Sequence, residues 1–129
     1  MSSDNTVKSR NGYGLEKQFT SVTGLKKLLK ADKPQFINEH GINQVVDSDY
    51  AFERDGKKIY FDLTTTYRSD RAKQKAYNAM ICKLKFDHDC EFYIVAGDVK
   101  DDGSGPSVYL FEGLDGVISI ESAIRMVKG

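Results

Sequence analysis

Asp55-Gly56 constrains the fold more than any other part of the sequence, because it predicts a β-hairpin between two strand-like segments. Type I′ hairpin turns need a positive φ at both central residues, which makes Asp-Gly one of the strongest short hairpin signals. The flanking segments are residues 50–54 and 57–66. The sequence therefore predicts two antiparallel strands joined by this turn.

The second predicted strand carries an acid in its middle. The apolar residues Ile59, Phe61 and Leu63 alternate with Tyr60, Asp62 and Thr64. Alternation with a period of two predicts a half-buried strand that has one polar face. Aspartate is disfavoured within strands and is costly when it loses its water, so Asp62 needs a specific partner.

The other periodicities predict a mixed α/β (α+β) domain. Helical spacing covers residues 14–31, with a kink or break at Gly24, and Ser69 is the expected N-cap of a helix that runs to about residue 85. A final helix is expected over residues 121–127. Further strands are expected at residues 91–97, 107–113 and 117–120, and short ones are possible at 35–38 or 43–46. We expect residues 1–11 to be a flexible N-terminal segment and residues 12–129 to form a single domain.

Length and composition favour one globular domain. The chain has 129 residues, of which 40% are hydrophobic and 29% are charged. No apolar run approaches the roughly 20 residues that span a bilayer, and the N-terminus lacks a signal-peptide core, so we expect a cytoplasmic protein without a membrane partner. Cys82 and Cys90 are too few for a disulfide framework or a zinc site, so they are expected to be reduced structural thiols.

Charge is unevenly distributed although the formal net charge is zero. Residues 54–85 carry nine basic and three acidic side chains, whereas residues 86–129 carry three basic and nine acidic ones. A basic face is compatible with a polyanionic partner such as nucleic acid. Solvated helix faces would give the same pattern, so charge alone does not decide between the two.

Three acids fall where they could share a metal ion. A turn centred on residues 55 and 56 places Asp49 opposite Asp62, so their carboxylates can converge. Adjacent carboxylates repel one another unless a cation neutralises them, and oxygen ligands suit Mg²⁺. Glu16, beside the apolar stripe of the first helix, is a candidate third ligand. Alternatively, Asp49 is a turn residue, as Asp47 could equally be, and Glu16 is simply solvated.

The helix after the acidic strand carries a candidate lysine. On a helical wheel Lys73 falls inside the arc formed by the apolar residues, and Lys75 falls on the opposite side. A lysine on a buried face needs an anionic partner, which the metal cluster or its phosphate would provide. A structural salt bridge from Asp62 to Lys73 or Lys58 is the alternative. The expected phosphate contacts are Arg68, Arg71 and Lys75, with Gln74 and Thr64 lining the cleft.

The motif Asp49…Asp62-Leu63-Thr64-Thr65-Thr66…Arg71-Ala72-Lys73-Gln74 resembles the PD-(D/E)XK nuclease superfamily over roughly residues 12–97. The resemblance implies a restriction-endonuclease-like αβββαβ core that binds Mg²⁺ or Mn²⁺. Asp49 and Asp62 would match its two acids, Glu16 its first-helix acid, and the carbonyl of Leu63 a further ligand. Thr64 stands at the motif's lysine position, as in variants whose lysine has moved to the following helix, and Lys73 would be that lysine.

The resemblance therefore predicts a Mg²⁺-dependent endonuclease that hydrolyses the phosphodiester bonds of DNA, or of RNA as the less favoured substrate. Because the chain is short, a sequence-specific enzyme would act as a homodimer or with a tethered partner. The alternative is a catalytically inactive module of the same fold that binds nucleic acid or protein. A third possibility is an α+β binding domain without phosphodiester chemistry.

Overall fold

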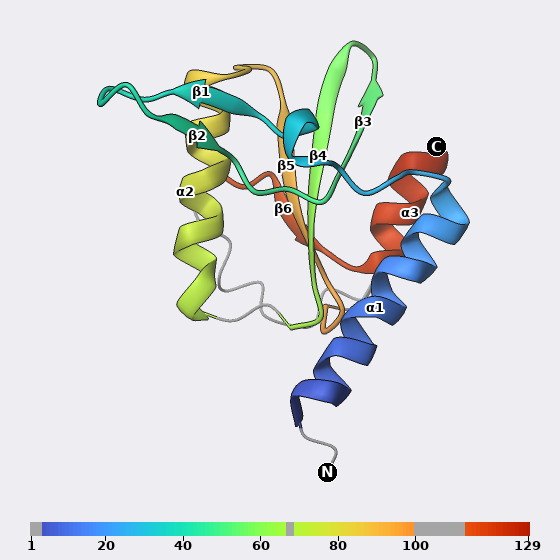
Figure 1. The fold of residues 1–129 in the computed structure, drawn as a ribbon. Helices are drawn as coiled ribbons and strands as arrows, with labels where there is room; N and C mark the ends of the chain where they lie inside the picture. Colours follow the sequence, from blue (N-terminus) through green and yellow to red (C-terminus); the bar gives the residue numbers. More distant parts are fainter. Residues whose placement is uncertain (1–3, 67–68, 100–112) are drawn as a thin grey trace.

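A four-stranded mixed sheet forms the centre of the molecule (Figure 1). The structure is a computed structural model that describes residues 4–66, 69–99 and 113–129. The strands lie in the order β3 (Tyr50–Arg54), β4 (Lys57–Thr64), β5 (Glu91–Ala96) and β6 (Gly116–Ile118). Strand β3 is antiparallel to β4, whereas β4, β5 and β6 are parallel to one another.

Helices cover both faces of this sheet, which makes the fold a mixed α+β arrangement as expected. Helix α2 lies on one face, and α1 and α3 lie together on the other (Figure 1). A separate antiparallel hairpin, β1–β2, and a short 3₁₀ helix, η1, precede the sheet. These elements are α1 (Asp4–Thr23), η1 (Lys30–Asp32), β1 (Gln35–Ile37), β2 (Asn43–Val45), α2 (Ser69–Lys85) and α3 (Ile120–Lys128).

The β3–β4 hairpin is confirmed with the predicted turn. Asp55 and Gly56 have φ values of 53° and 79°, the positive angles that a type I′ turn requires at both positions. The register pairs Tyr50 with Phe61, so the chain before β3 passes beside Asp62. The turn at one end of the hairpin thus sets which residues meet at its other end.

Strand β4 is buried on both faces, so the prediction of a half-buried strand is wrong. Tyr60 is 1% exposed on the α2 side, and Phe61 is fully buried on the side of α1 and α3. Because β4 and β5 are parallel, their connection must cross over the sheet, and α2 within that connection covers the face that we expected to be solvated. Asp62 consequently lies in the interior and not at the surface.

The first helix lies earlier in the chain than the sequence indicates. Helix α1 begins at Asp4, inside the expected flexible segment 1–11, and ends at Thr23, whereas the prediction covered residues 14–31. Gly24 adopts a φ of 75° and donates its N–H to the carbonyl of Thr20, which is typical of a helix C-terminus. The leucines after it have helical spacing but are not in a helix, because Leu25 and Leu28 pack into the cores on opposite faces of the sheet.

The remaining described elements agree closely with the predictions. Helix α2 has the expected range, β5 ends one residue early, and both short strands expected near residues 35–46 form as β1 and β2. Strand β6 and helix α3 each begin one residue earlier than expected. The strand expected at residues 107–113 lies almost wholly outside the described residues. Among the described residues, no helix is long and apolar enough to cross a membrane.

Candidate active site

Asp49 lies immediately before β3, beside Asp62 of β4. Its backbone N–H donates to the carbonyl of Phe61 over 2.8 Å, which continues the contact between the two strands. Its Oδ2 accepts a hydrogen bond from the N–H of Leu63 over 2.7 Å. These two bonds fix the Asp49 carboxylate next to the strand that carries Asp62, as the hairpin register predicted.

Asp62 is a buried acid with an altered proton affinity. It is only 6% exposed. Burial raises the pKa of the Asp62 carboxyl to about 6, the Lys75 ammonium opposes this rise, and Asp49 adds to it through its charge and through hydrogen bonding. Asp62 is therefore a weaker acid in the folded protein than a hydrated aspartate is.

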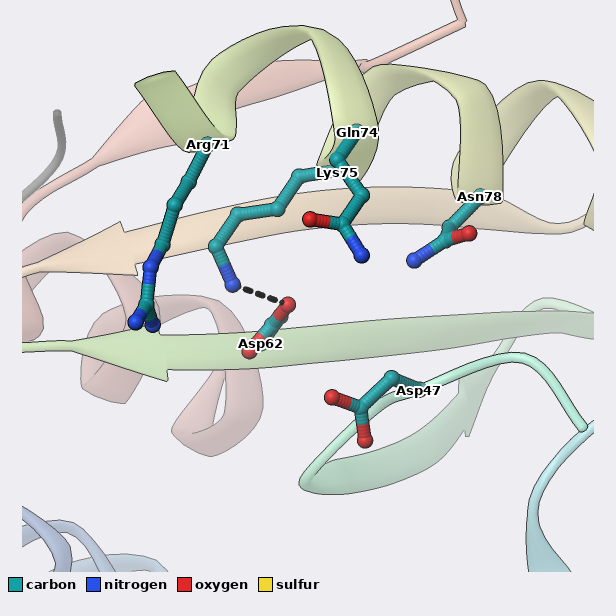
Figure 2. A pocket seen from close by; sticks show the side chains of 6 residues that line it. All are labelled: Asp47, Asp62, Arg71, Gln74, Lys75 and Asn78. Carbon is teal, nitrogen blue, oxygen red and sulfur yellow. Dashed lines mark hydrogen bonds and ion pairs between the residues drawn. The ribbon is translucent and has the colours of Figure 1, made fainter. Parts of the chain in front are cut away.

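Lys75 on α2 is the cationic partner of Asp62. Its Nζ lies 2.6 Å from Oδ2 of Asp62, and the two side chains are 15% and 8% exposed respectively. Figure 2 shows the Lys75 side chain running from the helix to the strand. The pair is therefore a nearly buried, charge-assisted hydrogen bond between two layers of the fold.

The prediction that Lys73 faces the interior is wrong. Lys73 is exposed, whereas Lys75 lies on the helix face that contacts the sheet. The fully buried residues of α2 are Ala72, Ala79 and Cys82. The helical wheel predicted that the helix face with the large apolar side chains is buried. These side chains are exposed, namely Tyr77 at 51%, Met80 at 37% and Leu84 at 57%. Small residues, and not the largest apolar ones, form the buried face of α2.

Glu16 does not join the two aspartates directly. Its Oε1 accepts from Nζ of Lys27 over 2.9 Å, and the same ammonium lies 3.9 Å from Oδ1 of Asp49. The hydrogen bond to Glu16 raises the pKa of Lys27 above its usual value. Lys27 is held there because the next residue, Leu28, donates its N–H to the carbonyl of Asp49 over 2.7 Å. A lysine therefore stands between Glu16 and the acid pair.

A polar cavity of about 300 Å³ opens beside Asp62. Figure 2 shows Arg71, Gln74 and Lys75 extending from α2 toward β4, with Asp47 on the loop opposite. Asp47 also forms an ion pair with Lys33 over 3.1 Å. The cavity is lined by Asp47, Asp62, Arg71, Gln74, Lys75 and Asn78. It thus combines carboxylates, cations and amides, which is a set suited to a phosphate ester and its counter-ion.

The other residues of the predicted site have mixed positions. Arg71 and Gln74 line the cavity as expected, whereas Arg68 lies outside the described residues. The hydroxyl of Thr64 donates to the carbonyl of Thr66 over 2.9 Å. The N–H of Leu63 donates a hydrogen bond to Asp49. Metal binding by the carbonyl of Leu63 stays a prediction.

Asn78 and Lys27 were not predicted as site residues, and Asp47 was expected only as a turn residue. Asn78 follows Lys75 by three residues and so shares its helix face, a relation that would have been visible had Lys75 been placed inward. Lys27 gave no comparable signal, because its position depends on the non-helical path of the chain after Gly24.

The metal donors that this site offers are carboxylates, of which Asp47 and Asp62 line the cavity and Asp49 does not. Within residues 4–66, 69–99 and 113–129, no three His, Cys, Asp or Glu side chains form a group that could hold a metal ion. Mg²⁺ does not need such a cage, since one or two carboxylates together with water and substrate phosphate commonly suffice. Asp49 and Asp62 fit this mode, because the hairpin register and the hydrogen bond from Leu63 place the Asp49 carboxylate next to Asp62.

Comparison with known proteins gives no further guide to the function. No protein-family model, curated protein or solved structure matches the chain. The geometry of the site and the sequence motif therefore carry the functional assignment.

Proposed function

We propose that this chain is a Mg²⁺- or Mn²⁺-dependent nuclease that hydrolyses phosphodiester bonds, with a restriction-endonuclease-like core. The observation that carries the proposal is the hydrogen bond from the N–H of Leu63 to Asp49, which holds that acid beside Asp62, where Lys75 is bound. Elements α1, β3, β4, α2 and β5 follow the order αββαβ, which is one strand short of an αβββαβ core, since the strands before β3 form a separate sheet.

Asp49 and Asp62 would hold the metal ion. A divalent ion bound there would lower the pKa of a water molecule and offset the charge that develops on the phosphate. Neutralising the repulsion between the two carboxylates would in turn stabilise the ionised form of Asp62. This explains why a pair of adjacent acids would be kept in a nearly buried position.

The other side chains have distinct parts in the proposed site. The N–H of Leu63 and the ammonium of Lys27 orient Asp49. Lys75 holds a positive charge against Asp62, where it would counter the negative charge of the attacked phosphate. Arg71 and Gln74 line the same cavity and would bind the nucleic-acid backbone on the solvent side. Lys75 thus takes the role that the sequence motif suggested for Lys73.

The proposal predicts stabilisation by Mn²⁺ that depends on the acid pair. At a Mn²⁺ concentration tenfold above its Kd, binding to the folded state adds about 1.4 kcal/mol and raises Tm by about 5 °C. Asp62→Asn should abolish this rise and any metal-dependent cleavage of DNA or RNA. Asp55→Asn is the matched control, because Asp55 lies at the opposite, exposed end of the same hairpin and an Asn-Gly turn is equally favourable.

Failure of both measurements would overturn the proposal. If Mn²⁺ left Tm unchanged and no single- or double-stranded DNA or RNA were cut, the acid pair would not be a metal site. If Asp62→Asn kept wild-type cleavage, the active residues would lie elsewhere in the chain.

A module of this fold that binds nucleic acid without cutting it is the second candidate. The ion pair between Lys75 and Asp62 favours it, because the ammonium already supplies a cation to the buried carboxylate. This candidate predicts binding of nucleic acid by the wild type without metal-dependent stabilisation or cleavage. The Mn²⁺ titration therefore separates the two candidates.

A further inference from the structure

Residues of the β1–β2 hairpin and of the C-terminal half of α2 line a second cavity. The two elements lie side by side in Figure 1. The volume of the cavity is about 310 Å³. Phe36, Tyr77 and Ile81 give it aromatic and apolar walls. Polar groups complete its lining, including Glu39, Gln44 and Lys85. The cavity thus offers flat apolar surfaces together with a few hydrogen-bonding groups.

The two cavities are neighbours along one helix. Asn78 lines the first cavity, and Tyr77 and Ile81 line the second. A helix rises 1.5 Å per residue, so Asn78 and Ile81 are separated by about 4.5 Å along the axis. A ligand that spans adjacent units of a polymer is therefore long enough to reach from one cavity to the other.

We infer that this second cavity binds one unpaired nucleobase of the strand whose phosphodiester lies at Asp62, an inference that rests on the proposed function. Aromatic stacking binds unpaired bases of any sequence, because every base presents a π-face. Tyr77 is 51% exposed and is available for this contact. The substrate class is then single-stranded or locally unpaired nucleic acid.

The charged and polar groups match this occupant. Arg71 and Lys75 at the first cavity and Lys85 at the second give α2 positive charge along the path of a phosphate backbone. Glu39 and Gln44 offer acceptors for the amino groups on base edges. The volume lies at the lower end of the range for ligand sites, as expected for a single heterocycle.

A comparison of intact and abasic oligonucleotides tests the inference. Fluorescence anisotropy would measure binding of a short single-stranded oligonucleotide, as DNA and as RNA, to the full chain in EDTA. The same oligonucleotides without bases keep the phosphates but remove the stacking partner. The variants are Tyr77→Leu and the matched control Phe86→Leu, since Phe86 is 50% exposed just beyond α2 and does not line the cavity.

Tyr77→Leu should weaken binding of the intact oligonucleotide by about tenfold. It should have no effect on the abasic one, and Phe86→Leu should bind both as the wild type does. The ratio between DNA and RNA affinities identifies the preferred strand. An unchanged affinity of Tyr77→Leu, or an equal loss on intact and abasic strands, would overturn the inference, as would a wild type that binds neither nucleic acid.

Failure of the proposed function is visible separately. Base-dependent binding through Tyr77 without metal-dependent cleavage would reject the nuclease and keep the base site. Cleavage that depends on Asp62, with no role of Tyr77 in binding, would keep the nuclease and reject the base site.

Discussion

Ionisation of Asp62 opposes folding, so replacing this residue by asparagine should change how the stability depends on pH. The pKa of Asp62 is about 6 in the folded protein, against an ordinary value of 3.8. The folded state therefore binds more protons than the unfolded state between these values, and the free energy of unfolding falls as pH rises through this window. The shift corresponds to a contribution of about 3 kcal/mol to the free energy of unfolding. This contribution is fully present below the ordinary pKa and is lost above about pH 6.

Urea unfolding in EDTA, from about pH 4 to about pH 8, measures this effect. Other groups titrate as well, so the quantity to compare is the stability of the wild type minus that of Asp62→Asn at each pH. This difference should fall by about 2 kcal/mol between pH 4 and pH 7, because part of the full effect is already lost at pH 4. For Asp55→Asn, an exposed aspartate of the same hairpin, the difference should be flat. A flat curve for Asp62→Asn too would refute the buried, proton-binding state of Asp62.

Three further outcomes follow from the same geometry. Lys75→Met should raise the pKa of Asp62 above about 6 in a carboxyl NMR titration, because the opposing ammonium is lost, whereas Lys73→Met at the exposed position should not. Cleavage should increase with pH through about 6, because only ionised Asp62 binds a metal; a pH–rate profile that is flat there contradicts this role. Gly97→Ala should lower the free energy of unfolding by about 1–3 kcal/mol in chemical denaturation, since its Cβ would lie 2.9 Å from the carbonyl oxygen of Thr65; a variant as stable as the wild type contradicts this.

The sequence predicted the parts of the site that depend on neighbouring residues. The Asp55-Gly56 turn fixes the register of β3 and β4, and the register brings Asp49 to Asp62 without help from any other element. Such a local relation follows from the period and the turn chemistry alone.

The parts that depend on packing between layers were not predictable in the same way. The face of α2 that enters the core carries the small residues Ala72 and Ala79, whereas the larger Tyr77 and Met80 are exposed. The sequence pattern weights large apolar residues most, so it selected Lys73 over Lys75. The failure to predict the position of Glu16 has a similar explanation. Lys27, which separates Glu16 from the aspartates, belongs to a segment whose path depends on tertiary hydrogen bonds.

The division of the site between two layers also bears on the order of folding. Both carboxylates belong to one hairpin, whose contacts are local, whereas Lys75 arrives only when α2 docks and β5 pairs with β4. Until docking, Asp62 is hydrated and titrates like an ordinary aspartate. In slightly acidic solution we therefore expect the docking of α2 to take up a proton, which a pH indicator would report during refolding. Docking of α2 is then a protonation as well as a packing event.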